Sequence, residues 1–345
     1  MKTEDSFKIT NSVKKEKWDE FVYNHPHGNI FQTPDMAEVY KRTKNYEPIT
    51  LAVVDENNDE IKAILLAVVI KDLSGMLGSF SARSIIKGGP LYSDINALKI
   101  LMAYYNKTIK KRALYTEIRM MFEDPQLSFL HGNGYFHEDE LNFLIDLNKS
   151  KDELWSNLSK SRRKGINRAK KRGVIIEEIH DKSLIPIFYR LLRETYDRAK
   201  IPLADISLFE SGFDVLVPRN KAKFFIAKYE EDYIGARFVL TYNGMVYAWY
   251  AGVLKEYSRL YSNDLLAWHA IEWGSSNGYH VFDFGGAGKP NEKYGVREFK
   301  KQFGGNLVNI GRYKKVHSPR KLWIAMKGFK VWRKKVYLLR GFLRI

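Results

Sequence analysis

The residues of this chain best suited to chemistry lie in one stretch, FDFGGAGKPNEKYGVREFKKQFGG, residues 282–305. An apolar strand end leads into a glycine-rich loop beside Asp283, and a short basic helix pattern with Lys300 and Lys301 follows. Glycines let backbone N–H groups approach a ligand closely. Asp283 has the chemistry to accept a proton or orient an amine, and the lysines have the chemistry to hold a phosphate or stabilise an oxyanion. The residues alone fit equally well with a glycine-rich turn followed by a solvated basic helix.

The composition limits the chemistry that this stretch can perform. The 345 residues carry a formal charge of +17, which favours a polyanionic partner such as nucleic acid, an anionic membrane surface or a phosphate-rich substrate. The chain has no cysteine, which excludes disulfides, thiolate zinc sites and a cysteine nucleophile. Its eight histidines show no metal-ligand spacing, and no Walker loop, GxSxG or GxGxxG motif is present.

The elements that must position these residues follow the same order in both halves. The first half predicts a helix, two strands around a polar turn, a further helix and two further strands, at residues 14–23, 48–70, 96–110, 114–120 and 140–147. The second half predicts a helix, a strand, a hairpin turning at Asn243-Gly244, a helix and a last strand, at residues 184–200, 224–229, 233–254, 263–277 and 279–284. This repetition predicts a duplicated α/β (α+β) unit with mixed sheets. The glycine loop then follows a strand at its C-terminal end, where open α/β sheets usually hold their sites.

A capping box at Ser150 and Glu153 marks the predicted boundary between the halves. We therefore expect domains at residues 1–148 and 149–315, with a tail at 316–345. Just after the boundary, residues 159–173 include eight Lys or Arg among fifteen. Four of them are candidate phosphate contacts, unless the segment is only a solvated basic helix: Lys160, Arg162, Arg163 and Arg168.

The tail after Pro319 predicts a basic amphipathic helix. Residues 320–345 include nine Lys or Arg and no acid. One side of the helical wheel is apolar and consists of Leu322, Met326, Phe329, Trp332, Val336, Leu339 and Leu343. Such a helix either packs back on the first domain or makes a peripheral contact with an anionic membrane.

No membrane-spanning or secreted character is expected from the sequence. The N-terminal residues lack an apolar signal core, and the longest apolar run, Ala63 to Ile70, is too short to span a bilayer. We expect a cytoplasmic protein, with residues 319–345 as a peripheral contact at the inner membrane face.

Several motifs in one order resemble the FemABX-type peptidyltransferases and related GNAT-like acyltransferases. The family's DFGG loop and its FK-x-x-FG segment correspond to residues 283–286 and 299–304. GNIFQTPDMAEVYK, with Phe31 and Gln32, is similar to the start of the family's first helix, and KGGPLYSD is similar to its glycine-proline strand end. The basic segment is similar to the family's opening of the second domain. The resemblance runs from about Trp18 to Tyr313.

The resemblance implies tandem GNAT-like domains and transfer of an aminoacyl or acyl group to an amine. The donor in this family is commonly aminoacyl-tRNA and the acceptor carries a diphosphate or a lipid link, so no cofactor is expected. The family's functional lysine corresponds to Lys300, which would stabilise the oxyanion as the amine attacks, and Asp283 would steer the amine or accept its proton. Further substrate contacts are expected at Gln32, Lys87, Gly285, Gly286, Phe299 and Lys301.

The chain departs from the family at three places. Gly88 stands where many members have an arginine, with Lys87 beside it. No long helical arm interrupts the second domain. KEYSRLYSND stands where GNAT enzymes have their acyl-CoA loop, which makes CoA pyrophosphate binding less expected.

Two other functions remain open from the sequence. A CoA-dependent N-acyltransferase acting on an amino sugar in polysaccharide biosynthesis would use the same fold. A non-catalytic nucleic-acid-binding module would use the basic segment but would leave the glycine loop without a role.

Overall fold

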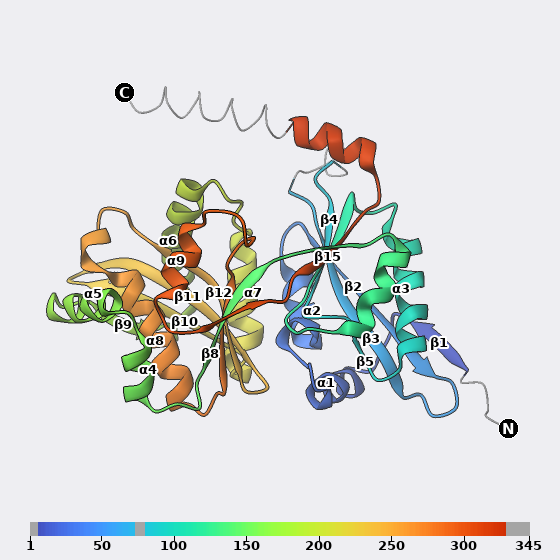
Figure 1. Cartoon of the computed structure of the whole chain (residues 1–345), viewed down its shortest axis with the longest axis horizontal. Helices are drawn as coiled ribbons and strands as arrows, with labels where there is room; N and C mark the ends of the chain where they lie inside the picture. Colours follow the sequence, from blue (N-terminus) through green and yellow to red (C-terminus); the bar gives the residue numbers. More distant parts are fainter. Residues whose placement is uncertain (1–5, 73–79, 329–345) are drawn as a thin grey trace. The chain divides into compact units, whose positions relative to one another are not determined.

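The computed structural model describes residues 6–72 and 80–328, which form two units, each built on its own β-sheet (Figure 1). The described part of unit 1 comprises residues 6–37, 45–72, 80–138 and 312–328. Unit 2 comprises residues 38–44 and 139–311.

Unit 1 has a mixed sheet in the order β1-β2-β3-β4-β6-β15-β7, with β5 paired to β3. Its strands are β1 (Phe7–Thr10), β2 (Tyr46–Asp55), β3 (Ile61–Ile70), β4 (Arg83–Lys87), β5 (Leu91–Tyr92), β6 (Tyr115–Arg119), β7 (Phe136–Glu138) and β15 (Arg312–Val316). Its helical elements include α1 (Lys15–Asn24), η1 (Ile30–Gln32), α3 (Ile95–Ile109) and η3 (Pro125–Asn133), while α2 (Pro34–Arg42) runs from unit 1 into the unit 2 segment. Strands β2, β3 and β4 are antiparallel, and α3 leads to β6, which is parallel to β4.

Helix α3 covers one face of this sheet. Asp94 caps its first turn, and Leu98, Leu101 and Met102 are fully buried in a core shared with β2 and β3. The side chains of β6 alternate, so that Ile118 enters this core while Glu117 lies on the opposite face.

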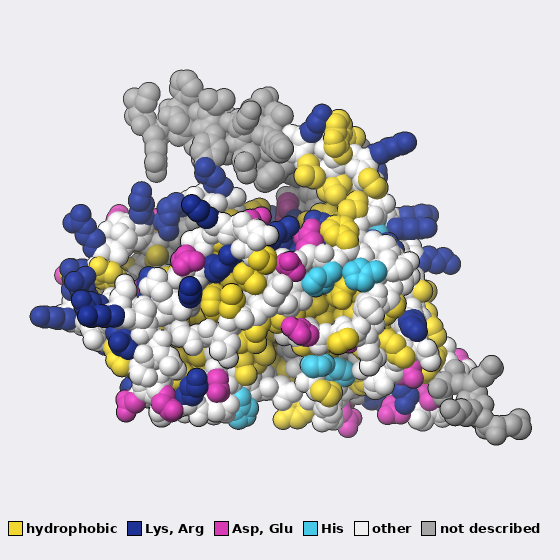
Figure 2. Space-filling model, viewed as in Figure 1, with side chains coloured by type: hydrophobic (Ala, Val, Ile, Leu, Met, Phe, Trp, Pro, Cys, Tyr) yellow, Lys and Arg dark blue, Asp and Glu magenta, His cyan; other side chains and the backbone are white. Residues whose placement is uncertain are grey.

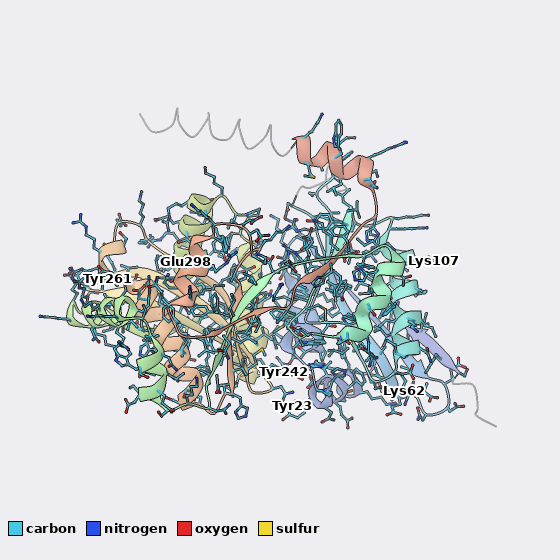
Figure 3. The ribbon with its side chains drawn as sticks, in the orientation of Figure 1. Tyr23, Lys62, Lys107, Tyr242, Tyr261 and Glu298 are labelled. Atoms are coloured by element: carbon cyan, nitrogen blue, oxygen red, sulfur yellow. The ribbon has the colours of Figure 1, made fainter. Side chains whose placement is uncertain are left out.

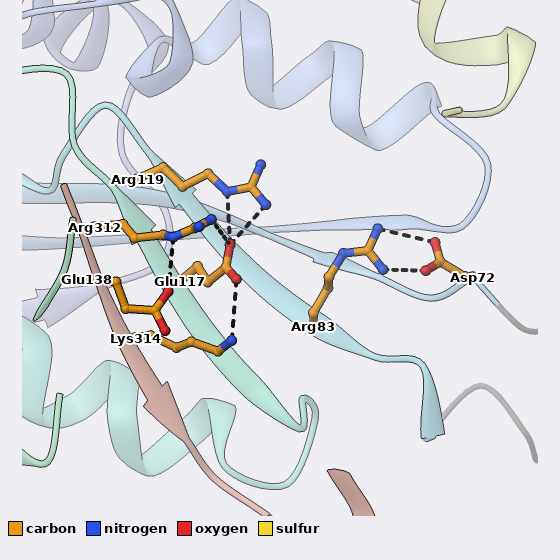
Figure 4. A network of polar contacts seen from close by, with 7 residues as sticks. All are labelled: Asp72, Arg83, Glu117, Arg119, Glu138, Arg312 and Lys314. Carbon is orange, nitrogen blue, oxygen red and sulfur yellow. Dashed lines mark hydrogen bonds and ion pairs between the residues drawn. The ribbon is translucent and has the colours of Figure 1, made fainter. Parts of the chain in front are cut away.

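The opposite face carries a charged network around Glu117 (Figure 4). Arg119 Nη2 lies 2.9 Å from Glu117 Oε2, and the register of β6 with β15 brings Arg312 and Lys314 within 3.7 Å and 3.8 Å of the carboxylate. Burial alone would raise the pKa of Glu117, but these three cations lower it below its usual value. The buried carboxylate therefore stays charged and links β15 to the sheet.

Unit 2 has a second mixed sheet in the order β14-β8-β13-β12-β11-β10-β9. Its strands are β8 (Leu141–Asp146), β9 (Ile175–Glu178), β10 (Ala222–Tyr229), β11 (Asp232–Tyr242), β12 (Met245–Val253), β13 (Val281–Gly286) and β14 (Asn306–Asn309). Its α-helices include α4 (Lys151–Asn157), α5 (Lys160–Lys171), α6 (Ile185–Ala199), α7 (Ile206–Leu216), α8 (Ser262–Ser276) and α9 (Gly295–Lys301), with short helical turns η4 (Lys182–Leu184), η5 (Val217–Arg219) and η6 (Ser258–Leu260).

The two units repeat one pattern, as the sequence predicts. In unit 2, β10, β11 and β12 are antiparallel, and α8 leads to β13, which is parallel to β12. This is the arrangement of β2, β3, β4, α3 and β6 in unit 1. The predicted tandem α/β fold with mixed sheets is confirmed. No helix within residues 6–72 and 80–328 exceeds 15 residues, in agreement with the expected lack of a long helical arm.

The division of the chain differs from the expected ranges 1–148 and 149–315. Strand β8 pairs with β13 and β14, and its Phe143 and Ile145 are buried in the unit 2 core. Strand β15 pairs with β6 and β7 and so returns to unit 1. The sequence pattern predicts β8 as a strand, but the pattern does not identify the strand's neighbours.

The described part of the tail, residues 319–328, is helical. Trp323, Ile324 and Met326 are 59%, 51% and 57% exposed, so they do not pack into a core. The remaining residues of the predicted amphipathic helix lie outside the described range. In the part of the chain that the structure describes, no helix has the length and apolar character needed to cross a membrane.

Candidate active site

Asp283 stands near the C-terminal end of β13 and is 1% exposed. Its Oδ1 accepts hydrogen bonds from Asn142 Nδ2 on β8, at 2.8 Å, and from the backbone N–H of Gly285, at 2.7 Å. These bonds fix the carboxylate against the neighbouring strand and form the first turn of the glycine loop. Asp283 is therefore held from both sides at the point where β13 ends.

The loop needs glycine at two positions for steric reasons. Gly285 has φ 75°, which is what requires glycine there, because a Cβ would make only ordinary contacts, 3.4 Å from the Ala248 carbonyl oxygen and 3.8 Å from Lys300 Nζ. Gly288 has φ 74°, and a Cβ there would lie 2.9 Å from the ring of Tyr294. Other residues rarely adopt this left-handed conformation. The predicted backbone freedom thus serves to bring the loop against Lys300 and Tyr294.

Lys300 extends from α9 to the same loop. Its Nζ donates to the carbonyl oxygens of Gly285, at 2.9 Å, and Gly286, at 2.8 Å, and lies 5.6 Å from the centroid of the Phe284 ring. An ammonium group has three N–H donors. Two are directed at these carbonyls, which leaves one for a substrate oxygen.

The surroundings of Lys300 lower its pKa to about 8. Burial is the largest cause, and the positive charge of Arg237 acts in the same direction, whereas the carboxylates of Asp283 and Glu140 raise the pKa. At neutral pH the group is mostly protonated. A positive donor in a partly dry site is suited to stabilising a developing oxyanion.

An aromatic cluster supports this geometry. Phe299 and Phe303 of the FK-x-x-FG segment pack on Phe284 with centroid distances of 6.4 Å and 5.3 Å. Gly304, with φ 79°, lets the chain pass close to α4, because a Cβ there would lie 2.6 Å from the Asn157 carbonyl oxygen. Phe299, a predicted substrate contact, is half-buried in this cluster, where it packs on Phe284 and Phe303.

The two parallel strands at the site separate there. β12 pairs with β13 only from Met245 to Tyr247, opposite Val281 to Asp283. Beyond that point β12 continues alongside β11, while β13 passes into the glycine loop. The site residues therefore gather where the sheet opens, at the C-terminal ends of parallel strands.

The four predicted basic residues of α5 differ in their surroundings. Arg162 forms an ion pair with Asp264 of α8, donates to Gln302 Oε1 at 2.9 Å and lies 4.7 Å above the Phe299 ring. Arg163 donates to the carbonyl oxygen of Ser156 at 2.7 Å. Both guanidinium groups thus hold unit 2 together, which favours a structural role over the predicted phosphate contact.

Lys160 and Arg168 lie on the exposed side of α5. Figure 2 shows Lys and Arg side chains gathered over this helix. Arg168 Nη1 donates to the hydroxyl of Tyr261, labelled in Figure 3, at 3.1 Å. Both side chains are exposed, so the predicted phosphate contact stays a prediction for these two residues.

The remaining predicted residues are spread over both units. Gln32 is fully buried in unit 1, where its amide bonds the backbone of Leu66 and the carbonyl oxygen of Lys87, which favours a structural role. Lys87 is half-buried, with its Nζ 4.2 Å from the Phe31 ring centroid. In unit 2, Lys301 is exposed at the end of α9, and Gly286 presents its carbonyl oxygen to Lys300.

The sequence is similar to a known domain family and to curated transferases. A family model described as an Acetyltransferase (GNAT) domain matches residues 156–301, which include the glycine loop and Lys300. A Lipid II:glycine glycyltransferase of Staphylococcus epidermidis is 24% identical over 238 residues, 64% of this chain and 55% of that protein. The enzyme of the same name from Staphylococcus aureus is 24% identical over 233 residues, 63% of this chain and 54% of that protein. The chain thus spans about half the length of these relatives.

Solved structures agree in fold. The crystal structure of FemX matches with a TM-score of 0.70 at 18% identity, over 92% of this chain and 100% of FemX. These matches confirm the resemblance to the FemABX-type, GNAT-like transferases. A tandem GNAT protein from the clavulanic acid biosynthesis pathway matches this FemABX-like chain with a TM-score of 0.59 at 10% identity, over 91% of this chain and 99% of that protein.

Sequence reasoning missed two residues of the candidate site. Asn142, which orients Asp283, lies within a strand pattern and carries no signal of its own. Arg237 is 3% exposed on β11 and influences Lys300. The detectable signal was a single arginine inside the apolar strand YIGARFVLTY, where a charged residue has an energetic cost that needs an explanation.

Proposed function

We propose that this protein transfers an aminoacyl group from aminoacyl-tRNA onto an amine of a cell-wall precursor or a related glycan or peptide acceptor. The observation that carries the proposal is the position of Lys300 Nζ on the carbonyls of Gly285 and Gly286, with Asp283 beside it. The names of the glycyltransferase relatives support this reaction class.

The proposed step is attack of the acceptor amine on the ester carbonyl of the donor. A C–N bond forms, the C–O bond to the ribose breaks, and the proton lost by the amine ends on the ribose oxygen, which leaves as the free hydroxyl of the tRNA. The remaining N–H of Lys300 stabilises the oxyanion of the tetrahedral intermediate. Asp283, held by Asn142 and Gly285, favours the charged form of Lys300 and is the candidate to steer the amine.

The region before α8 supports a donor other than CoA. Helix α8 has Asp264 in its first turn, where a pyrophosphate would otherwise be bound by the helix N-terminus. Burial raises the pKa of Asp264, while the Arg162 ion pair favours its charged form. A carboxylate at this place opposes a second anion, and the exposed cations of α5 offer an alternative surface for tRNA phosphates. We propose that the reaction needs no further cofactor.

A comparison of donors tests the proposal. The protein is incubated with a lipid-linked peptidoglycan precursor and either charged tRNA or acetyl-CoA, and product is measured by mass spectrometry. We expect transfer from charged tRNA and none from acetyl-CoA. Transfer from acetyl-CoA alone would replace the proposal with the CoA-dependent N-acyltransferase.

Substitution of Lys300 tests its role within the reaction. Lys300→Met should lower turnover about ten- to a thousandfold, the range for loss of one oxyanion donor, with a smaller change in substrate affinity. Lys301→Met is the matched control, because neighbouring helical side chains point about 100° apart. Near-normal turnover of Lys300→Met would contradict the assignment.

A further inference from the structure

Arg237 lies in the middle of the unit 2 sheet, where a charged group is costly. It pairs with Phe225 of β10 and Ala251 of β12 and is 3% exposed. A buried guanidinium normally requires an ion pair or several hydrogen bonds. An apolar residue of similar size would fill the position without that cost.

The partners of Arg237 within the described residues are few. Its Nη2 donates to Asn263 Oδ1 at 3.4 Å, while its Nε has no hydrogen-bond partner. No carboxylate in the described part of the chain forms an ion pair with it. Burial lowers the pKa of Arg237 to about 10, so the group remains charged at neutral pH. The positive charge is therefore buried without a balancing anion from the protein.

The position of Arg237 links it to the candidate active site. Its Cζ lies 5.9 Å from the centroid of the Phe284 ring, and Lys300 Nζ lies 5.6 Å from the same centroid. Asn263, which accepts the hydrogen bond from Arg237, lies in the first turn of α8, shortly after η6. Two cations thus flank the residue that follows Asp283, on the part of unit 2 where β12 and β13 separate.

We propose that Arg237, with Asn263, binds an oxyanion group of a substrate, a carboxylate or a phosphate, next to Lys300. The planar fork of a guanidinium matches both groups and can donate two parallel hydrogen bonds to either. The proposal has two parts. That an anion binds at Arg237 is independent of the proposed function, and that this anion belongs to a substrate rests on the proposed function. The bound group would supply the counter-charge that the protein lacks and would place the reacting carbonyl or amine beside Lys300.

The test measures the thermal unfolding of the full chain with inorganic phosphate or acetate, against chloride at equal ionic strength and pH. For the unchanged protein we expect the unfolding temperature to rise with one or both oxyanions and to saturate, because the ligand stabilises the folded state. Arg237→Met should unfold at a higher temperature than the unchanged protein in chloride, since it removes a buried unpaired charge, and should show no rise with oxyanions. Arg193→Met, an exposed change on α6, should keep the rise.

The outcomes separate the possibilities. A rise with phosphate alone identifies a phosphate group as the ligand, and a rise with acetate alone identifies a carboxylate. The absence of a rise for the unchanged protein with either anion, or an equal rise for Arg237→Met, overturns the proposal. Arg237→Lys provides a second variant if Arg237→Met does not fold, and it should keep the charge but require about tenfold or more anion, since it loses the fork. A clear anion response in a protein that transfers nothing would retain this site and contradict only the proposed function.

Discussion

Lys300 is held close to its titration point by its neighbours. Burial and Arg237 lower its pKa to about 8, and Asp283 and Glu140 limit the shift. If the charged form stabilises the oxyanion, turnover at saturating substrate must fall as pH rises through about 8, because the ammonium loses its proton there. In Lys300→Arg the fall should move to higher pH, because a guanidinium stays charged.

A pH profile of turnover for both proteins checks this prediction. The acceptor amine also titrates in this range, so the ratio of the two profiles isolates the lysine. A ratio independent of pH between 7 and 9.5 would show that the charge of Lys300 does not limit the reaction.

The residues that sequence reasoning located and missed differ in a physical way. Lys300, Asp283 and the glycines belong to one short segment whose loop brings them together, so their order along the chain was informative. Gln32 was expected as a substrate contact because of the family resemblance, yet its amide donates to backbone carbonyl oxygens of β3 and β4. Arg237 lies on another strand, β11, and only the three-dimensional structure reveals that it lies beside Phe284.

At the scale of one element, the basic side chains of helix α5 divide into two groups, one that bonds neighbouring elements of unit 2 and one that is exposed. Arg162 and Arg163 face α8, α4 and α9, while Lys160 and Arg168 face solvent. Lys160→Glu with Arg168→Glu should weaken tRNA binding and flatten the dependence of its affinity on salt, since two phosphate contacts are lost. Thermal stability should change little, because both side chains are exposed.

Filter binding across a series of salt concentrations measures the slope. Arg162→Glu is the contrasting variant, and it should lower the unfolding temperature, because it places a second carboxylate beside the partly buried Asp264. An unchanged slope for the double variant would mark α5 as a solvated basic helix.

The elements themselves were largely predictable where a local rule applies. The Ser150 capping box and the Asn243-Gly244 hairpin were predicted and are present. Strands β14 and β15 have only four and five residues and alternate weakly, so their pattern carries no comparable signal. Which strands pair across large sequence separations depends on the core as a whole and could not be taken from local periodicity.

At the scale of the whole molecule, the tail is the candidate for a contact with an anionic membrane. The exposed apolar side chains of residues 319–328, including Trp323, Ile324 and Met326, favour a surface contact. We expect the full chain to co-sediment with anionic vesicles and a chain ending at Ser318 to lose most of this binding, because the basic and apolar residues of the tail act together. Neutral vesicles serve as the control. Equal binding of both chains would remove the tail from membrane contact, and loss of solubility on shortening would support packing of the tail on unit 1.

The return of β15 to the unit 1 sheet, after all strands of unit 2, has a consequence for synthesis of the chain. The ribosome releases most of unit 1 first, but its sheet lacks β15 between β6 and β7 until residues 312–316 have emerged. The strands of unit 2 are all made by residue 309. The later half of the chain can therefore complete its sheet first, and the nascent first half keeps an open sheet edge, of the kind that promotes wrong strand pairing, from the synthesis of β6 until that of β15.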